Sequence, residues 1–122
     1  MPVKIVQAGD PVLRQRARAL TAGEIRSHEI QQLIEEMREA MRSAPGVGLA
    51  APQFAIPLQL AVIEDRSEYH KDLAPDLMSE RERKPVPFQV LINPEIVSCS
   101  DEHRLFFEGC LSLAGFCGTV PR

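Results

Sequence analysis

The feature that most constrains the fold of this sequence is one amphipathic helix. Strand-forming segments follow it with no helical pattern between them. Apolar residues recur at steps of three and four, which predicts a helix with a single apolar face. They are Ile30, Leu33, Ile34, Met37 and Met41. Pro45 and Gly46 end that helix. Because the later apolar segments follow one another without helices, we expect antiparallel sheets packed with this helix, an α+β fold.

Two capping patterns precede the helix. Asp10 and Pro11 predict a short helical turn, with the aspartate as its cap and the proline in its first position. Thr21 and Glu24 have the spacing of a capping box. We expect this box at the start of the longer helix.

The remaining apolar segments predict strands. They cover residues 58–63, 88–92, 95–99 and 103–107. We expect the last two to form a hairpin around a polar turn at 100–102. Residues 66–87 mix charges with prolines and are expected to form a surface loop. A chain of 122 residues fits one domain, 1–122.

Charge and hydropathy exclude two classes of partner. The formal net charge is -3 at pH 7, so we expect no direct nucleic-acid binding, which needs a basic face. No apolar run approaches the roughly 20 residues that span a bilayer, so we expect no membrane contact. The chain starts without a charged-then-apolar leader. We expect a cytoplasmic protein, or an organellar one whose targeting peptide has been removed.

The glycine-rich segment 46–53 is the first candidate site. Gly46 and Gly48 let another backbone approach closely, and the small side chains beside them leave a cleft open. Gln53 can direct its side-chain N–H groups at a developing oxyanion. A tight turn that feeds a strand explains the same residues without any chemistry.

The segment 108–112, with the sequence EGCLS, is the second candidate site. Its cysteine, Cys110, fits a metal ligand, a nucleophile or a buried thiol. A nucleophile needs a neighbouring base or positive charge that lowers the thiol pKa, and Glu108 acts in the opposite sense. A metal cation would favour the thiolate, so metal ligation is the best supported of the functional interpretations.

Together the two segments resemble signature motifs of the peptide deformylase family, GxGLAAxQ and EGCLS. Residues 10–13 are similar to the usual opening of that family, so the resemblance covers nearly the whole chain. The 66–87 loop and the two phenylalanines before Glu108 are most similar to the organelle-related branch. A third family motif, a helical HExxH, is missing from this sequence. We therefore expect a C-terminally incomplete, deformylase-like domain without the central metal-binding helix.

The resemblance implies a hydrolase that removes the N-formyl group from the formyl-methionine of nascent polypeptides, at the ribosome, and releases formate. It implies a divalent metal, Fe²⁺ first with Zn²⁺, Ni²⁺ or Co²⁺ in its place, and Cys110 as one ligand. It assigns oxyanion stabilisation to the Gln53 side chain and the backbone N–H of Leu111. Glu108 would help to position the metal ligand without binding the metal itself. Gly48 and its neighbours would pair with the substrate as a strand. The residues that would bind substrate are Gly46, Val47, Gly48, Leu49, Glu108 and Gly109.

Other interpretations stay open. A chain without HExxH can be a peptide-binding module that performs no hydrolysis. Loss of a central helix exposes apolar surface, so we expect such a chain to self-associate unless something covers it. A local metal site from His103, Cys110 and Cys117 requires a bend, because strand positions seven apart face opposite sides. A redox role for the last two is disfavoured by the absence of a CxxC pattern.

Overall fold

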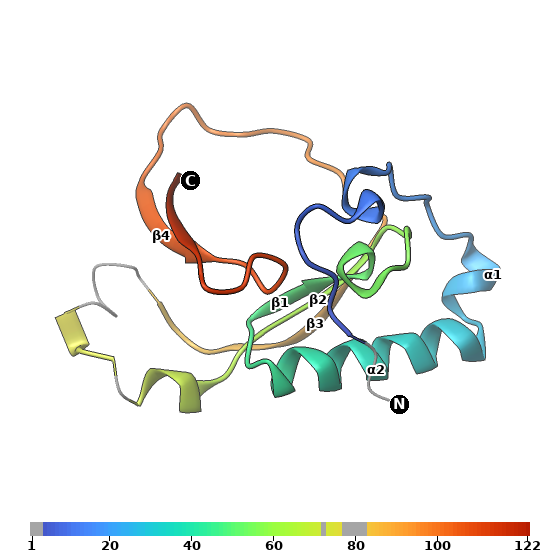
Figure 1. Cartoon of the computed structure of the whole chain (residues 1–122), viewed down its shortest axis with the longest axis horizontal. Coiled ribbons are helices and arrows are strands. Elements are labelled where there is room, and N and C mark those ends of the chain that lie inside the picture. Colours follow the sequence, from blue (N-terminus) through green and yellow to red (C-terminus); the bar gives the residue numbers. More distant parts are fainter. Residues whose placement is uncertain (1–3, 72, 77–82) are drawn as a thin grey trace.

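The structure, a computed structural model, describes residues 4–71, 73–76 and 83–122 of the chain. A long helix packs against a three-stranded antiparallel sheet, and a two-stranded hairpin follows at the end of the chain (Figure 1). The predicted α+β architecture is confirmed. None of the described helices combines the length and apolar character needed to cross a membrane.

The apolar face predicted from the sequence belongs to helix α2 (His28–Ser43). Its five predicted core residues are all buried, and Met37 and Met41 are fully inaccessible to solvent. They pack in one cluster with residues of the sheet, among them Leu49, Leu60 and Val62. Burying one such side chain contributes about 1.5–3 kcal/mol. This contact between helix and sheet therefore fixes the scaffold on which the site is built.

The sheet has the strand order β1-β2-β3. Its strands are β1 (Gly48–Ala50), β2 (Leu60–Asp65) and β3 (Val86–Ile92), all antiparallel to their neighbours. The predicted strands at 58–63 and 88–92 are confirmed as β2 and β3, each with shifted bounds. Within the described residues β1 pairs only with β2, so its other edge is open.

The direction of the backbone groups in β1 follows from one hydrogen bond. The Glu64 N–H donates to the Val47 carbonyl at 2.9 Å. Successive residues of an antiparallel strand direct their N–H and C=O groups to opposite sides. Val47 and Leu49 therefore face β2, and the N–H and C=O of Gly48 face the open edge.

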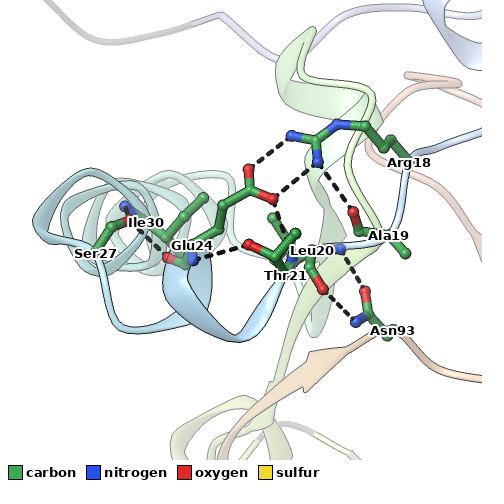
Figure 2. A network of polar contacts seen from close by, with 8 residues as sticks. All are labelled: Arg18, Ala19, Leu20, Thr21, Glu24, Ser27, Ile30 and Asn93. Atoms are coloured by element: carbon green, nitrogen blue, oxygen red, sulfur yellow. Dashed lines mark hydrogen bonds and ion pairs between the residues drawn. The ribbon is translucent and has the colours of Figure 1, made fainter.

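The capping box of Thr21 and Glu24 forms as predicted, but its predicted place at the start of the long helix is wrong. It opens a separate short helix, α1 (Ala22–Ile25). Helix α2 has its own cap, because the Ser27 hydroxyl accepts a hydrogen bond from the Ile30 N–H (Figure 2). The Asp10 prediction is confirmed, since its carboxylate accepts from the Val12 N–H in a 3₁₀ helix at Pro11–Arg14.

The end of β3 is attached to the segment before α1 by one asparagine side chain. Asn93 accepts from the Leu20 N–H at 2.8 Å and donates to the Leu20 carbonyl at 2.9 Å (Figure 2). Its backbone has a φ of 50°, a left-handed conformation that asparagine adopts more readily than most residues. Beside it the Arg18 guanidinium bonds both carboxylate oxygens of Glu24, which lowers the pKa of Glu24 to about 2.

The predicted hairpin of 95–99 with 103–107 is wrong. Residues 95–99 are irregular, and the side chains of Ile96 and Val97 are exposed. The turn at Asn93 directs the chain away from the sheet, and residues 93–104 arch over to the hairpin without joining a strand (Figure 1). Strand β4 (Leu105–Gly109) pairs instead with β5 (Cys117–Pro121), a strand that the sequence did not predict.

The predicted surface loop at 66–87 is partly regular. It contains a 3₁₀ helix at Ser67–His70, and β3 begins inside its predicted range, at Val86. The His70 ring and the Arg83 guanidinium both bond the Asp65 carboxylate, which joins the two ends of the loop. Residues 72 and 77–82 of this loop lie outside the described residues.

A partly buried ion pair joins the last turn of α2 to β2. Arg42 donates to both carboxylate oxygens of Glu64, at 2.8 and 2.7 Å, and Glu64 is only 8% exposed. The hydrogen bond from Arg42 holds the pKa of Glu64 below its ordinary value of 4.5. A carboxyl group with a lowered folded-state pKa stabilises the protein above its unfolded pKa and loses that contribution as the pH falls through the folded value.

We expect the variant Arg42→Met to lose less stability in acid than the parent, because Glu64 then titrates closer to its unfolded value. The free energy of urea unfolding, measured from about pH 6 down to about pH 3, should fall more steeply in the parent. Arg14→Met removes the same charge from a residue without an ion pair in the described structure, and should keep the parental slope. Equal slopes for the parent and Arg42→Met would contradict the role of this pair.

Candidate active site

The side-chain amide of Gln53 joins the two segments that the sequence singled out. Gln53 lies in a 3₁₀ helix (Ala51–Phe54) directly after β1, and Cys110 directly follows β4. The Gln53 Nε2 group lies 3.6 Å from the Cys110 Sγ and donates to the Ser112 Oγ at 3.0 Å. Its Oε1 accepts from the Ala50 N–H at 2.9 Å. Because the oxygen is held by its own segment, both amide N–H groups are directed at the cysteine loop.

A second contact between the two segments depends on the absence of a side chain at Gly46. A Cβ atom there would lie 2.7 Å from the Leu111 Cδ1 and 3.2 Å from its Cγ, closer than packed carbon atoms approach. At Gly48 an added Cβ would meet only ordinary contacts, the nearest being the Ile63 Cγ2 at 3.7 Å. The close contact at Gly46 is therefore with a side chain and not with another backbone, which was the prediction, and at Gly48 the backbone N–H and C=O face the open edge of β1.

A cleft of about 1080 Å³ lies where these segments meet. Its other walls are the C-terminal half of α2, residues 4–7 and the loop at 113–116. The volume is at the upper end of the range for small-molecule and cofactor pockets. The predicted site residues that line it are Gly46, Val47, Gly48, Gln53, Gly109, Cys110 and Leu111.

Two predicted site residues do not line the cleft. Leu49 is 2% exposed and belongs to the core, because its side chain points to the face of β1 that packs against the helix, opposite to the face of Ala50. The Glu108 carboxylate accepts from the Arg122 guanidinium at 2.7 and 2.5 Å, which joins β4 to the residue after β5. Their roles in substrate binding stay predictions.

The two backbone groups of Leu111 have different environments. Its carbonyl accepts from the Gln7 Nε2 at 2.9 Å. Its N–H has no acceptor among the described residues. Leu111 is also among the residues that line the cleft.

Two residues of this site, Ser112 and Gln7, were not predicted from the sequence. Ser112 is 5% exposed and holds the Gln53 amide, and its presence in the EGCLS segment was the available signal. Gln7 contacts the cysteine loop from the other end of the chain. No local pattern around Gln7 indicates that contact.

The described residues do not form a complete metal site. Cys110 is an exposed free thiol beside Gln53. Nowhere in the described ranges do three or more His, Cys, Asp or Glu side chains lie close enough to hold a metal ion. His103, Cys110 and Cys117 therefore do not converge into a local site. A catalytic zinc-type centre has three protein ligands, and these residues provide one candidate.

Comparisons with known proteins agree with these observations. The family model described as polypeptide deformylase matches residues 2–122. Peptide deformylase 1A, chloroplastic, from Solanum lycopersicum is 48% identical over 118 residues, which is 97% of this chain and 43% of that protein.

Solved structures show the same similarity. The K3U-bound class I type b peptide deformylase from Acinetobacter baumannii has a TM-score of 0.82 and 30% identity, over 100% of this chain and 70% of that chain. The Met-Ala-Ser-bound structure of the same enzyme has a TM-score of 0.81 and 30% identity, over 100% of this chain and 72% of that one.

The α+β fold with its cleft between two motif segments is thus of the deformylase type. This chain belongs to the polypeptide deformylase family, a family of metallohydrolases that use a divalent metal. The chain spans less than half the length of the tomato relative.

We expect Gly46→Ala to destabilise the protein by about 1–3 kcal/mol, because the new methyl group overlaps the Leu111 side chain, which must then shift from its packed position. Gly23→Ala is the matched control, since nothing lies within 4 Å of a Cβ there and alanine favours the α1 helix. Urea unfolding of both variants measures the difference. Equal stability of the two variants would show that the close approach at Gly46 is not required.

Proposed function

We propose that the protein containing this chain hydrolyses the N-formyl group of formyl-methionyl peptides and releases formate. The observation that carries this proposal is the contact of the Gln53 amide with Cys110 and Ser112. It joins the two motif segments of a deformylase inside one cleft. Membership of the deformylase family supports this reaction class.

The substrate would bind as an extended strand. Gly48 directs its N–H and C=O to the open edge of β1, and a peptide laid along that edge completes these hydrogen bonds. Val47 is 49% exposed beside it and offers an apolar contact. Leu49 anchors the strand in the core, so the edge is presented rigidly. The relative from Acinetobacter baumannii was solved with Met-Ala-Ser bound, a peptide of this kind.

The chemistry requires donors for a developing negative charge. Attack of water on the formyl carbon places a negative charge on the carbonyl oxygen, and preorganised N–H donors stabilise that charge. The candidate donors are the Gln53 amide, whose N–H groups contact Cys110 and Ser112 in this structure, and the Leu111 N–H, which has no acceptor among the described residues. The loss of one such donor lowers kcat by about 10²–10³ in a hydrolase.

We propose a divalent metal, ferrous iron first with zinc, nickel or cobalt in its place, with Cys110 as one thiolate ligand. Bound metals of this kind lower the pKa of a coordinated water towards neutrality. The Cys110 thiol is exposed at the cleft and accepts a hydrogen bond from Gln53, both of which suit a ligand. The described residues do not supply the remaining ligands.

A peptide-binding module without hydrolysis is the second candidate function. The open β1 edge and the cleft are present, while the described residues hold no group of three metal-ligating side chains. Such a module would bind formylated nascent peptides through the same strand. Binding without formate release distinguishes this candidate from the first.

For the protein expressed from its own gene and supplied with Fe²⁺ without oxygen, we expect formate release from a formyl-methionyl tripeptide. Cys110→Ala should abolish it, because the thiolate ligand is lost, and Gln53→Ala should lower kcat by about 10²–10³. Cys117→Ala is the matched control, an exposed cysteine on β5 that does not line the cleft, and should keep the parental rate. Thermal unfolding of each variant checks that it folds.

Two results would decide against the proposal. Formate release by Cys110→Ala at the parental rate would exclude the assigned metal ligand. A folded parent that binds the peptide and releases no formate would favour the binding module.

A further inference from the structure

We infer that Gln7 is a positioning residue for the hydrolysis proposed above: its side chain closes the turn that carries Cys110 and Leu111. The inference rests on that proposed function, because it concerns the orientation of the Leu111 N–H as an oxyanion donor. Gln7 lines the cleft but belongs to neither motif segment.

Both ends of the Gln7 amide bond the backbone of the turn. Its Nε2 donates to the Leu111 carbonyl at 2.9 Å, and its Oε1 accepts from the Ala114 N–H at 3.2 Å. These backbone groups lie on either side of Ser112 and Leu113, so one side chain holds the turn at both of its ends. The same Nε2 also lies 3.4 Å from the Ile5 carbonyl oxygen, a longer contact within its own segment.

The backbone on both sides of Gln7 is bonded to the site as well. The Val6 N–H donates to the Gln53 carbonyl at 2.8 Å, and the Ala8 N–H donates to the Ser112 carbonyl at 2.6 Å. Three successive residues therefore bond both motif segments. This rigid neighbourhood determines where the Gln7 side chain can reach.

The geometry of one peptide unit connects this turn to the oxyanion donor. The Leu111 N–H shares a peptide plane with the Cys110 carbonyl, and in a trans peptide these two groups point in opposite directions. The Cys110 carbonyl accepts from the Leu113 N–H at 3.0 Å. The direction of the Leu111 N–H is thus set by the position of Leu113. Gln7 bonds the residues on either side of the 112–113 segment and fixes that position.

This role differs from a contribution to overall stability. Gln7 is exposed, so its hydrogen bonds replace bonds to water and add little to the free energy of unfolding. A displacement of about 1 Å at a reacting group can lower the rate by about 10²-fold without unfolding the protein. The effect of losing Gln7 should therefore appear in kcat more than in KM or in the unfolding temperature.

The test uses the metal-loaded protein expressed from its own gene, with three variants. Gln7→Ala removes both bonds of the side chain. Gln7→Glu keeps an acceptor for the Ala114 N–H but replaces the donor to the Leu111 carbonyl with a second oxygen. Gln31→Ala is the matched control, because Gln31 is an exposed glutamine that donates one bond of 2.9 Å to a backbone carbonyl, that of Ile25. Kinetics on a formyl-methionyl tripeptide and amide hydrogen exchange are measured for each.

We expect Gln7→Ala to lower kcat by about 10- to 100-fold, with KM within about twofold of the parent. Its Ala114 amide should exchange about tenfold faster, because the acceptor is lost. Gln7→Glu should lower kcat similarly while Ala114 exchanges nearly as in the parent. Gln31→Ala should change neither quantity.

A kcat of Gln7→Ala within about twofold of the parent would overturn the inference, and so would an equal loss in Gln31→Ala. If the parent releases no formate, the proposed function fails, and the exchange of the Ala114 amide still tests the bridge. An unchanged Ala114 exchange rate in Gln7→Ala would then show that Gln7 does not hold the turn.

Discussion

The amide of Gln53 has its oxygen bonded within its own segment and its nitrogen bonded to a loop 57 residues further along the chain. The contact of the first motif segment with Cys110 and Ser112 depends on that division. The oxygen is fixed because Ala50 ends a strand whose middle residue, Leu49, is buried against α2. The nitrogen brings Cys110 and Ser112 to the same cleft. The core of helix and sheet thus determines where a polar contact between two loops can form.

The sequence predicted well what depends on local periodicity. The five apolar residues of α2 form its buried face, since a period of three and four residues leaves no other arrangement for a helix. The pairing of strands was predicted poorly. Residues 95–99 have the composition of a strand, yet the left-handed turn at Asn93 directs them away from the sheet. Strand β5 was missed because only Val120 within it is partly buried, so no alternating apolar pattern marks it.

In the candidate site, too, some residues could be predicted from the sequence and others could not. Motif resemblance identified Gln53, Cys110 and Leu111, and the structure brings these three residues to one cleft. Gln7 could not be predicted, because its contacts with Leu111 and Ala114 span more than 100 residues and no repeat or spacing connects them. Contacts of this kind appear only when the whole chain is folded.

The hairpin at the end of the chain carries apolar side chains on an exposed face. Leu105 and Phe107 are 71% and 66% exposed on β4. A two-stranded hairpin is only marginally stable in isolation. The expectation that such a surface leads to self-association stays a prediction. The candidate site lies at the end of this hairpin where β4 finishes at Gly109 and Cys110 follows.

The peptide proposed above binds in extended form along the open edge of β1, beside Gln53 and Cys110. Amide hydrogen exchange with and without a formyl-Met-Ala-Ser peptide tests it most directly. We predict that the Gly48 amide, which faces the open edge, exchanges more slowly when the peptide is bound, while Leu49, which faces β2, is unchanged. Protection confined to the outer edge of β3, or no change at Gly48 with the peptide bound, would contradict the claim.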